Sequence, residues 1–145
     1  MIDTYLAPMT QLELDYPAVK FIYMTGHLDG SGDLGNLHLR NEQIRDYCRL
    51  NGKVLYAFAD IESYDPDGQV NFMTLIVNDN CDYDSDSDGF RDRNWAVQWQ
   101  NYHVPWDGTN PDDAEWFSSS YARSQFLNCN RKAYAAWWLW ARLAG

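Results

Sequence analysis

Val19-Lys-Phe-Ile-Tyr-Met24 and Val54-Leu-Tyr-Ala-Phe58 are two short apolar runs, and the text between them decides the fold. A nearly continuous apolar run of this length is typical of a strand covered on both faces. A glycine-rich loop over residues 26–36 and a helical pattern over about 37–50 separate the runs, and Asn51-Gly52 closes the helix with a left-handed cap. The order strand, loop, helix, strand predicts a right-handed parallel crossover in an α/β fold.

Helical patterns flank this unit on both sides. Residues 3–15 are predicted to form a helix that Pro17 closes, and residues 93–102 a helix carrying Trp95 and Trp99. Between them, residues 72–77 fit a short strand or a buried loop segment. Residues 103–126, with their prolines and serines, are typical of a loop.

The last helix is unusually apolar. It is predicted to begin at a cap from Asn128 or Asn130 and to run through Ala144. Because it is apolar nearly all round, we expect it to be buried on more than one side or to lie at an interface. Its tryptophans are predicted to be core residues rather than a ligand platform.

Length and charge bound the class of protein. The chain has 145 residues, which favours one domain over residues 1–145, and no apolar run long enough to span a membrane. Its net charge is −10, and residues 60–92 hold ten acidic side chains and one basic one. The absence of a basic patch in the sequence argues against nucleic acid as a partner.

The densest part of the acidic segment matches a calcium-binding loop. Asp84, Asp86 and Asp88 fall at ligand positions 1, 3 and 5, and Gly89 falls at the turn position. The carbonyl of Phe90 would take position 7 and Asp92 position 9. Trp95 stands where the usual position-12 acid is expected, so the final ligand must come from elsewhere, with Asp79 and Asp82 as the nearer options and Asp60, Glu62, Asp65 and Asp67 beyond them. The alternative is a solvated acidic loop with no ion.

Polar residues follow each predicted parallel strand, where open sheets place their functional crevice. His27, Asp29 and Ser31 lie after the first strand, and Ser31 is a candidate nucleophile with His27 or His103 as base. Ser31 is equally a turn residue, and His27 a residue that anchors the loop. After the second strand, Asp60 and Glu62 fit either acid–base chemistry or loop stabilisation.

Four stretches of the chain resemble bacterial proteins related to SGNH (GDSL-like) hydrolases. They are residues 21–30, residues 35–45, Asp60-Ile-Glu-Ser-Tyr-Asp-Pro-Asp-Gly68 and the closing residues 132–145. The resemblance covers about Pro17 to Gly145. It implies a flavodoxin-like three-layer α/β/α fold with a short parallel sheet and a serine esterase site at the strand ends.

The chain departs from that family at each part of the site. The family's nucleophilic serine lies in an N-terminal segment, and this chain is expected to start beyond it, as a truncated domain. Leu28 stands where the family has an asparagine that holds the oxyanion, and Arg123 stands where relatives have the catalytic histidine. Arginine stays protonated near neutral pH and cannot act as a general base.

Two functions from different classes therefore remain. One is a hydrolase acting on small-molecule esters. The other is a non-catalytic, calcium-stabilised module that binds a glycan or a protein through exposed rings at Trp106, Trp116, Phe117 and Tyr121. A calcium loop and many aromatic residues favour an extracellular protein.

Two further expectations concern covalent and quaternary structure. Cys48 fits a helix core, whereas Cys81 and Cys129 flank loops and are the expected disulfide pair. A sheet without its first strand and helix would expose an edge and an apolar helix face, which another chain usually covers. We therefore expect a homodimer, with the last helix or the N-terminal helix near the interface.

Overall fold

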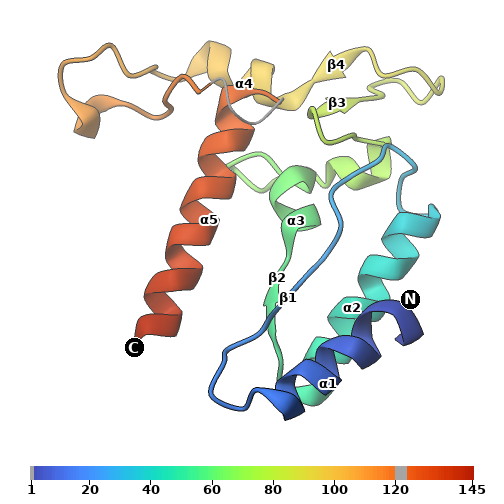
Figure 1. Cartoon of the computed structure of the whole chain (residues 1–145). Helices are drawn as coiled ribbons and strands as arrows, with labels where there is room; N and C mark the ends of the chain where they lie inside the picture. The colour runs from blue at the N-terminus through green and yellow to red at the C-terminus, as the bar shows by residue number, and fades with distance from the viewer. Residues whose placement is uncertain (1, 120–123) are drawn as a thin grey trace.

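Two small sheets and five α-helices make up the fold in the computed structural model, which describes residues 2–119 and 124–145 (Figure 1). The chain begins with a π-helical turn (Ile2–Leu6) that leads into α1 (Ala7–Asp15). The remaining elements are β1 (Ile22–Met24), α2 (Asn36–Asn51), β2 (Val54–Tyr56), α3 (Phe58–Ser63), a 3-10 turn (Phe72–Leu75), β3 (Asp82–Tyr83), β4 (Arg93–Asn94), α4 (Trp95–Tyr102), a 3-10 turn (Pro111–Asp113) and α5 (Phe126–Ala144).

The predicted β-loop-α-β unit is confirmed. Strands β1 and β2 are parallel, with Ile22 opposite Val54 and Met24 opposite Tyr56, and α2 connects them. Helix α2 ends where Gly52 takes the left-handed conformation, with φ of 60°. The fold is therefore mixed α/β, but the parallel sheet has two strands, and the second sheet, β3 with β4, is antiparallel.

The expectation that both faces of β1 are covered is wrong. Tyr23 is completely buried, whereas the next side chain, Met24, is 50% exposed. Helix α2 packs against β1 and β2, and α5 lies on the other side of the strands in Figure 1. A cavity of about 500 Å³, lined by Ile22, Met24, Tyr56 and Leu139 among others, separates α5 from the sheet.

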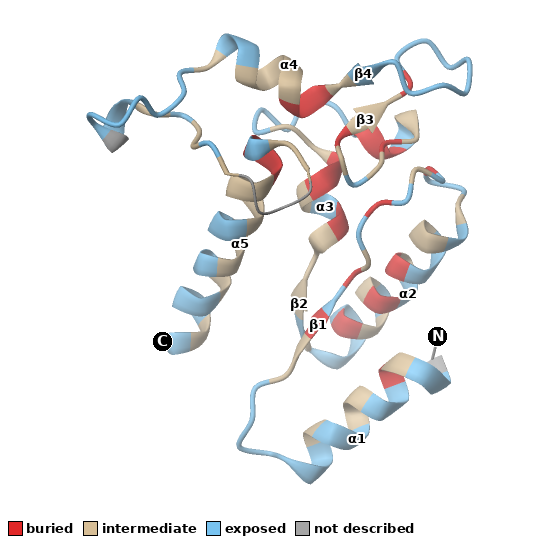
Figure 2. Cartoon of the chain, turned by 45° about the horizontal axis from the view of Figure 1, so that its top comes forward, coloured by how far each residue is buried: buried red, intermediate tan, exposed pale blue. Residues whose placement is uncertain are grey.

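The buried residues form two separate clusters, visible as two groups of red ribbon in Figure 2. The first lies between α1, β1 and α2 and contains Leu6, Tyr23, Ile44 and Cys48. The second and larger cluster lies under α3, α4 and the start of α5, and it contains Leu28, Ala59, Phe72, Met73, Val77, Cys81, Trp95, Ala96 and Leu127.

The second half of the chain differs from its predicted elements. Of the two alternatives for residues 72–77, the structure has the buried segment without a strand: residues 72–75 form a 3-10 turn in which Phe72 and Met73 are buried. Helix α4 begins at Trp95 because Asn94 accepts a hydrogen bond from the Val97 amide as N-cap. Helix α5 begins at Phe126, so neither Asn128 nor Asn130 is its cap. Asn128 is buried inside the helix, where its amide group donates to the Asp79 carbonyl and to Ser124 Oγ.

Two other expectations about the second half are wrong. Trp137, Trp138 and Trp140 are 70%, 63% and 62% exposed, so the tryptophans of α5 are not core residues. Cys81 and Cys129 are free thiols, as is Cys48. Burial raises the pKa of the Cys81 thiol to about 12, which makes it unreactive near neutral pH.

In the described part of the chain, no helix combines the length and the hydropathy that a bilayer crossing requires.

Candidate functional site

The acidic loop between β3 and β4 brings three carboxylates together. One oxygen from each of Asp84, Asp86 and Asp88 lies within 4.8 Å of the other two. Asp84 is buried at the base of the loop, and the other two side chains are exposed. Convergent carboxylate oxygens on a short segment are the ligands that a hard cation such as Ca²⁺ prefers.

Backbone amides wrap around Asp84 and fix the loop. Its Oδ1 accepts hydrogen bonds from the amides of Asp86, Ser87 and Asp88 (3.3, 2.7 and 3.3 Å), and its Oδ2 accepts one from Gly89 (2.7 Å). Burial opposes ionisation of Asp84, but these four donors outweigh it and lower the pKa of the carboxyl group. Gly89 has φ of 92°, a left-handed conformation that favours glycine at this turn.

Asp92 closes the loop instead of joining the three carboxylates. Its Oδ1 accepts from the Ser85 amide (3.0 Å) and its Oδ2 from the Ser85 hydroxyl (2.8 Å), and these bonds lower its pKa. Phe90 is 76% exposed, and its amide donates to Asp88 Oδ1. Phe90 and Asp92, at positions 7 and 9, both lie on the loop, but among the described carboxylates the close group contains Asp84, Asp86 and Asp88 without Asp92.

The two nearer candidates for the missing ligand have other partners. Asp82 accepts hydrogen bonds from the side chains of Asn78, Asn80 and Asn94. Burial opposes ionisation of Asp82, but these amides outweigh it and lower its pKa. Asp79 Oδ2 lies 3.8 Å from His27 Nδ1.

The loop after β1 holds Ser31 by a local contact. Asp29 Oδ1 accepts from both the Ser31 amide (2.9 Å) and the Ser31 hydroxyl (2.5 Å). His27 faces Asp79, and its Nδ1 is 3.3 Å from the Leu28 carbonyl oxygen. The described hydrogen bonds therefore join Ser31 to a carboxylate and not to an imidazole, which is the arrangement of a turn.

His103 belongs to a different surface. Its ring stacks on Trp99 with centroids 3.4 Å apart, and its Nδ1 lies 2.7 Å from the Trp99 carbonyl oxygen. It lines a cavity of about 350 Å³ together with Asp65, Trp95, Tyr102 and others. Ser31 and Asp29 are not among the residues that line this cavity.

Asp60 and Glu62 do not form a carboxylate pair. Asp60 Oδ1 accepts from Arg45 (2.5 Å) at the surface, whereas Glu62 is completely buried. Glu62 Oε2 accepts from the Leu28 amide (2.7 Å), and Oε1 lies 2.6 Å from Lys132 Nζ. Burial raises the pKa of Glu62, although Lys132 opposes this shift. The contacts of Glu62 stabilise the loop after β1, as one of the two sequence interpretations predicted.

Sequence reasoning missed the role of Asp79. Its carbonyl accepts from Ser124 Oγ (2.9 Å) and from the Asn128 side chain (3.0 Å), and its carboxylate faces His27. It therefore links the loop after β1 to the residues just before α5. No spacing rule joins positions so far apart in sequence, although an acid within an Asn-Asp-Asn run is a turn signal. Arg123 and Tyr121 lie outside the described residues.

Three of the predicted aromatic platform residues lie near one another. The Trp106 and Phe117 rings are 5.6 Å apart, and the Trp106 amide donates to the Trp116 carbonyl. Trp106 is about half exposed. Trp116 instead stacks on Phe126 and packs against the larger core cluster. The remaining platform is thus the exposed Trp106 with the partly buried Phe117 beside it.

Comparisons with known proteins add no relative. No protein-family model matches the chain, and neither a curated protein nor a solved structure matches it.

Proposed function

We propose that the chain is a calcium-stabilised, non-catalytic binding module, with Ca²⁺ held by the loop between β3 and β4. The observation that carries the proposal is the convergence of Asp84, Asp86 and Asp88 within 4.8 Å around a loop fixed by the amides on Asp84. Without an ion, three carboxylates this close repel one another. A divalent cation removes that repulsion and ties the loop together.

The ligand count sets the expected affinity. Ca²⁺ takes 6–8 oxygens, so the three aspartates need help from water, from the Phe90 carbonyl and from Asp92 through a bridging water. The loop lacks a bidentate acid at its end, because Trp95 is buried in the core. We therefore expect a Kd on the order of 10⁻⁴–10⁻³ M, the range of weak structural calcium modules.

A melting scan tests this function. A ligand that binds only the native state raises the unfolding midpoint, so millimolar Ca²⁺ should raise it relative to excess chelator. Asp86→Ala removes one ligand and should abolish the rise, whereas the matched control Asp112→Ala, an exposed aspartate elsewhere, should retain it. A midpoint that is the same in Ca²⁺ and in chelator would rule out the stabilising ion.

The bound partner in this proposal is a glycan that stacks on Trp106 and Phe117. An exposed tryptophan ring beside a partly buried phenylalanine ring suits the apolar face of a sugar, and the large negative charge of the chain disfavours anionic partners. A glycan screen with wild type and Trp106→Ala tests this choice. If Trp106→Ala still binds the glycan, the glycan-binding site does not include Trp106 and lies elsewhere on the chain.

Ester hydrolysis is the second candidate, and the pair His27 and Asp79 favours it. A carboxylate 3.8 Å from the imidazole can orient a general base, and His27 follows β1, where parallel sheets place functional residues. The His27 side chain is largely exposed, so it can rotate toward Ser31 on the same loop. The structure offers less support to His103, which is stacked on Trp99.

A short-chain ester assay separates the two candidates. If Ser31 is the nucleophile and His27 the base, Ser31→Ala and His27→Ala should each lower kcat/KM at least 100-fold, with His38→Ala as the control. Hydrolysis that persists in Ser31→Ala would exclude Ser31. If the wild type hydrolyses none of these esters, the result would favour the non-catalytic binding module.

An SGNH-like hydrolase would also have a more specific fold than mixed α/β. We propose a flavodoxin-like three-layer arrangement related to the SGNH hydrolases, supported by parallel β1 and β2, the α2 crossover and the bond from Tyr56 Oη to the Lys132 carbonyl in α5 (2.9 Å). An experimental structure in which α5 packs on α2 instead of facing the sheet would contradict this arrangement.

A further inference from the structure

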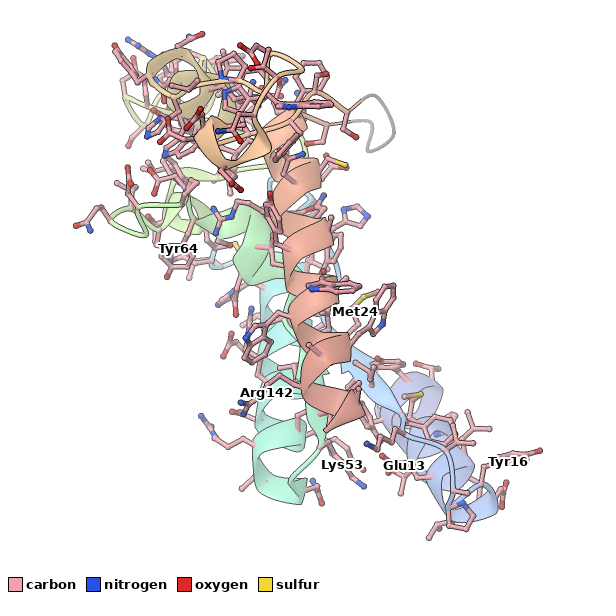
Figure 3. The ribbon with its side chains drawn as sticks, turned by 90° about the vertical axis from the view of Figure 1, so that its left-hand side faces the viewer. Glu13, Tyr16, Met24, Lys53, Tyr64 and Arg142 are labelled. Atoms are coloured by element: carbon pink, nitrogen blue, oxygen red, sulfur yellow. The ribbon has the colours of Figure 1, made fainter. Side chains whose placement is uncertain are left out.

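Helix α5 carries an apolar surface that no other described part of the chain covers. Its exposed residues with helical spacing form one face, here called the α5 stripe: Ala133, Tyr134, Trp137, Trp140, Ala141 and Ala144. Tyr134, Trp137 and Trp140 are 58%, 70% and 62% exposed. In Figure 3, which shows the side on which α5 lies, the helix stands in front of the sheet over most of its length.

The exposed apolar area of the α5 stripe lies at the upper end of the range for a monomer. A tryptophan or tyrosine offers 150–250 Å² of surface, so the three stripe aromatics and the neighbouring Trp138 leave roughly 400–600 Å² in water. The largest apolar patch of a typical monomer reaches about this size, and a standard interface buries about 800 Å² per partner. A hollow of about 540 Å³ beside Trp137 and Trp140 can receive a side chain from that partner.

Charge does not oppose covering this face. Helix α5 has no acidic residue, and its three basic side chains already have partners in the same chain. Lys132 pairs with Glu62, Arg131 donates to the Tyr64 carbonyl, and Arg142 stacks on Trp138 at 5.3 Å. Burying the stripe therefore desolvates almost no charge. Meanwhile the net charge of −10 disfavours an anionic bilayer as the covering surface.

The stripe is complementary to itself. When two copies of the helix cross antiparallel at Trp137, a residue that lies three or four positions before Trp137 in one copy faces the residue the same number of positions after Trp137 in the other copy. Tyr134 then faces Trp140, and Ala133 faces Ala141. Large side chains meet large ones, small ones let the backbones approach, and the contact repeats by two-fold symmetry.

We propose that the α5 stripe is the contact surface of a homodimer in which α5 of one copy packs antiparallel on α5 of a second copy, with Trp137 at the two-fold axis. This inference does not depend on calcium or on ester hydrolysis.

Light scattering of the full chain tests the surface. Wild type should have the mass of a dimer at micromolar concentration, and Trp137→Lys should raise the dimer dissociation constant by roughly 30-fold or more, as for a central aromatic hot spot. Because the Trp137 side chain is mostly exposed, the far-UV circular dichroism spectrum of the Trp137→Lys variant should match that of the wild type. Trp106→Lys, an exposed tryptophan outside α5, is the control and should remain dimeric. A monomeric wild type, or a dimer that Trp137→Lys leaves intact, would overturn the proposal.

Cysteine cross-linking tests the antiparallel geometry. Ala133→Cys and Ala141→Cys lie about 12 Å apart along one helix, too far for a disulfide within one chain. Mixing the two single variants under oxidation should give a covalent heterodimer, whereas each variant alone should not cross-link with itself at this position. Self-cross-linking of either variant would indicate a parallel or different contact. If a monomeric wild type cosediments with lipid vesicles and Trp137→Lys does not, the α5 stripe binds a membrane surface and the homodimer proposal is wrong.

Discussion

The unit from β1 to β2 and the segment from Asn78 to Asn94 differ in the bonds that hold them. The first is held by backbone pairing of two parallel strands and by apolar contacts of Tyr23, Ile44 and Cys48. The second has two-residue strands, and side chains of Asn78, Asn80, Asp82 and Asn94 hydrogen-bond one another and the backbone. Regular structure therefore organises one region, and individual polar residues organise the other.

Backbone conformation follows the same division. Among the described residues, Ile76, Cys81 and Ser87 are the non-glycine residues with positive φ, and all three precede or lie in the acidic loop. Such conformations cost free energy and persist only where surrounding contacts fix them. We therefore expect a single polar substitution between residues 76 and 94 to lower the free energy of unfolding more than a similar substitution in the first unit.

The largest predicted effect lies at the buried ion pair between α3 and α5, beside the first unit, where Glu62 also accepts a hydrogen bond from the Leu28 amide. Lys132→Met leaves the buried Glu62 carboxylate without its cation, which should lower the free energy of unfolding by about 3 kcal/mol at pH 7, as measured by urea denaturation. Burial already raises the pKa of Glu62 above its ordinary 4.5. The loss should therefore shrink as pH falls toward 4.5, because a protonated Glu62 no longer needs the partner.

The double variant Glu62→Gln with Lys132→Met is the control for this interpretation. It removes the buried charge together with its partner, and should recover part of the lost stability. If the single variant is as stable as wild type, the ion pair does not contribute to joining α3 and α5.

A smaller effect is expected from the asparagine between β4 and α4. Asn94→Ala removes the N-cap of α4 and the bonds from its amide to the Asn80 carbonyl and to Asp82, so we expect a loss of about 2 kcal/mol. Asn51→Ala, at the exposed end of α2, removes one bond to the Tyr47 carbonyl and should cost less than about 0.5 kcal/mol. Equal losses in the two variants would remove the contrast between the regions.

A smaller loss than that of Asn94→Ala is expected from the glycine that caps α2. Gly52→Ala places a Cβ on a residue with φ of 60°, where open space surrounds it, so the cost is conformational and should be about 1 kcal/mol. Gly52→Asn should lose less, because asparagine tolerates this conformation better. Thermal melts of both variants measure the difference, and a stabilised Gly52→Ala would show that the cap does not hold the left-handed conformation.

The sequence predicts the first region well because periodicity carries its structure. Apolar runs, a helical pattern and Asn-Gly were enough for β1, α2, β2 and the cap at Gly52. Spacing also predicted the grouping of Asp84, Asp86 and Asp88, because a tight loop brings alternate residues together.

Other features depend on contacts between distant positions, which no local pattern encodes. The pairing of Glu62 with Lys132, the role of Asp79 and the start of α5 at Phe126 all belong to this class. The prediction that the tryptophans of α5 are core residues was wrong because apolar composition indicates that a surface is buried, but not whether the same chain or another molecule buries it.

Calorimetric titration of the chelator-treated chain with Ca²⁺ measures directly whether Ca²⁺ binds and organises the acidic loop. We expect one site per chain with a Kd on the order of 10⁻⁴–10⁻³ M, absent in Asp86→Ala and unchanged in Asp112→Ala. Heats no larger than those of dilution for the wild type, or an unchanged site in Asp86→Ala, would contradict calcium binding by this loop.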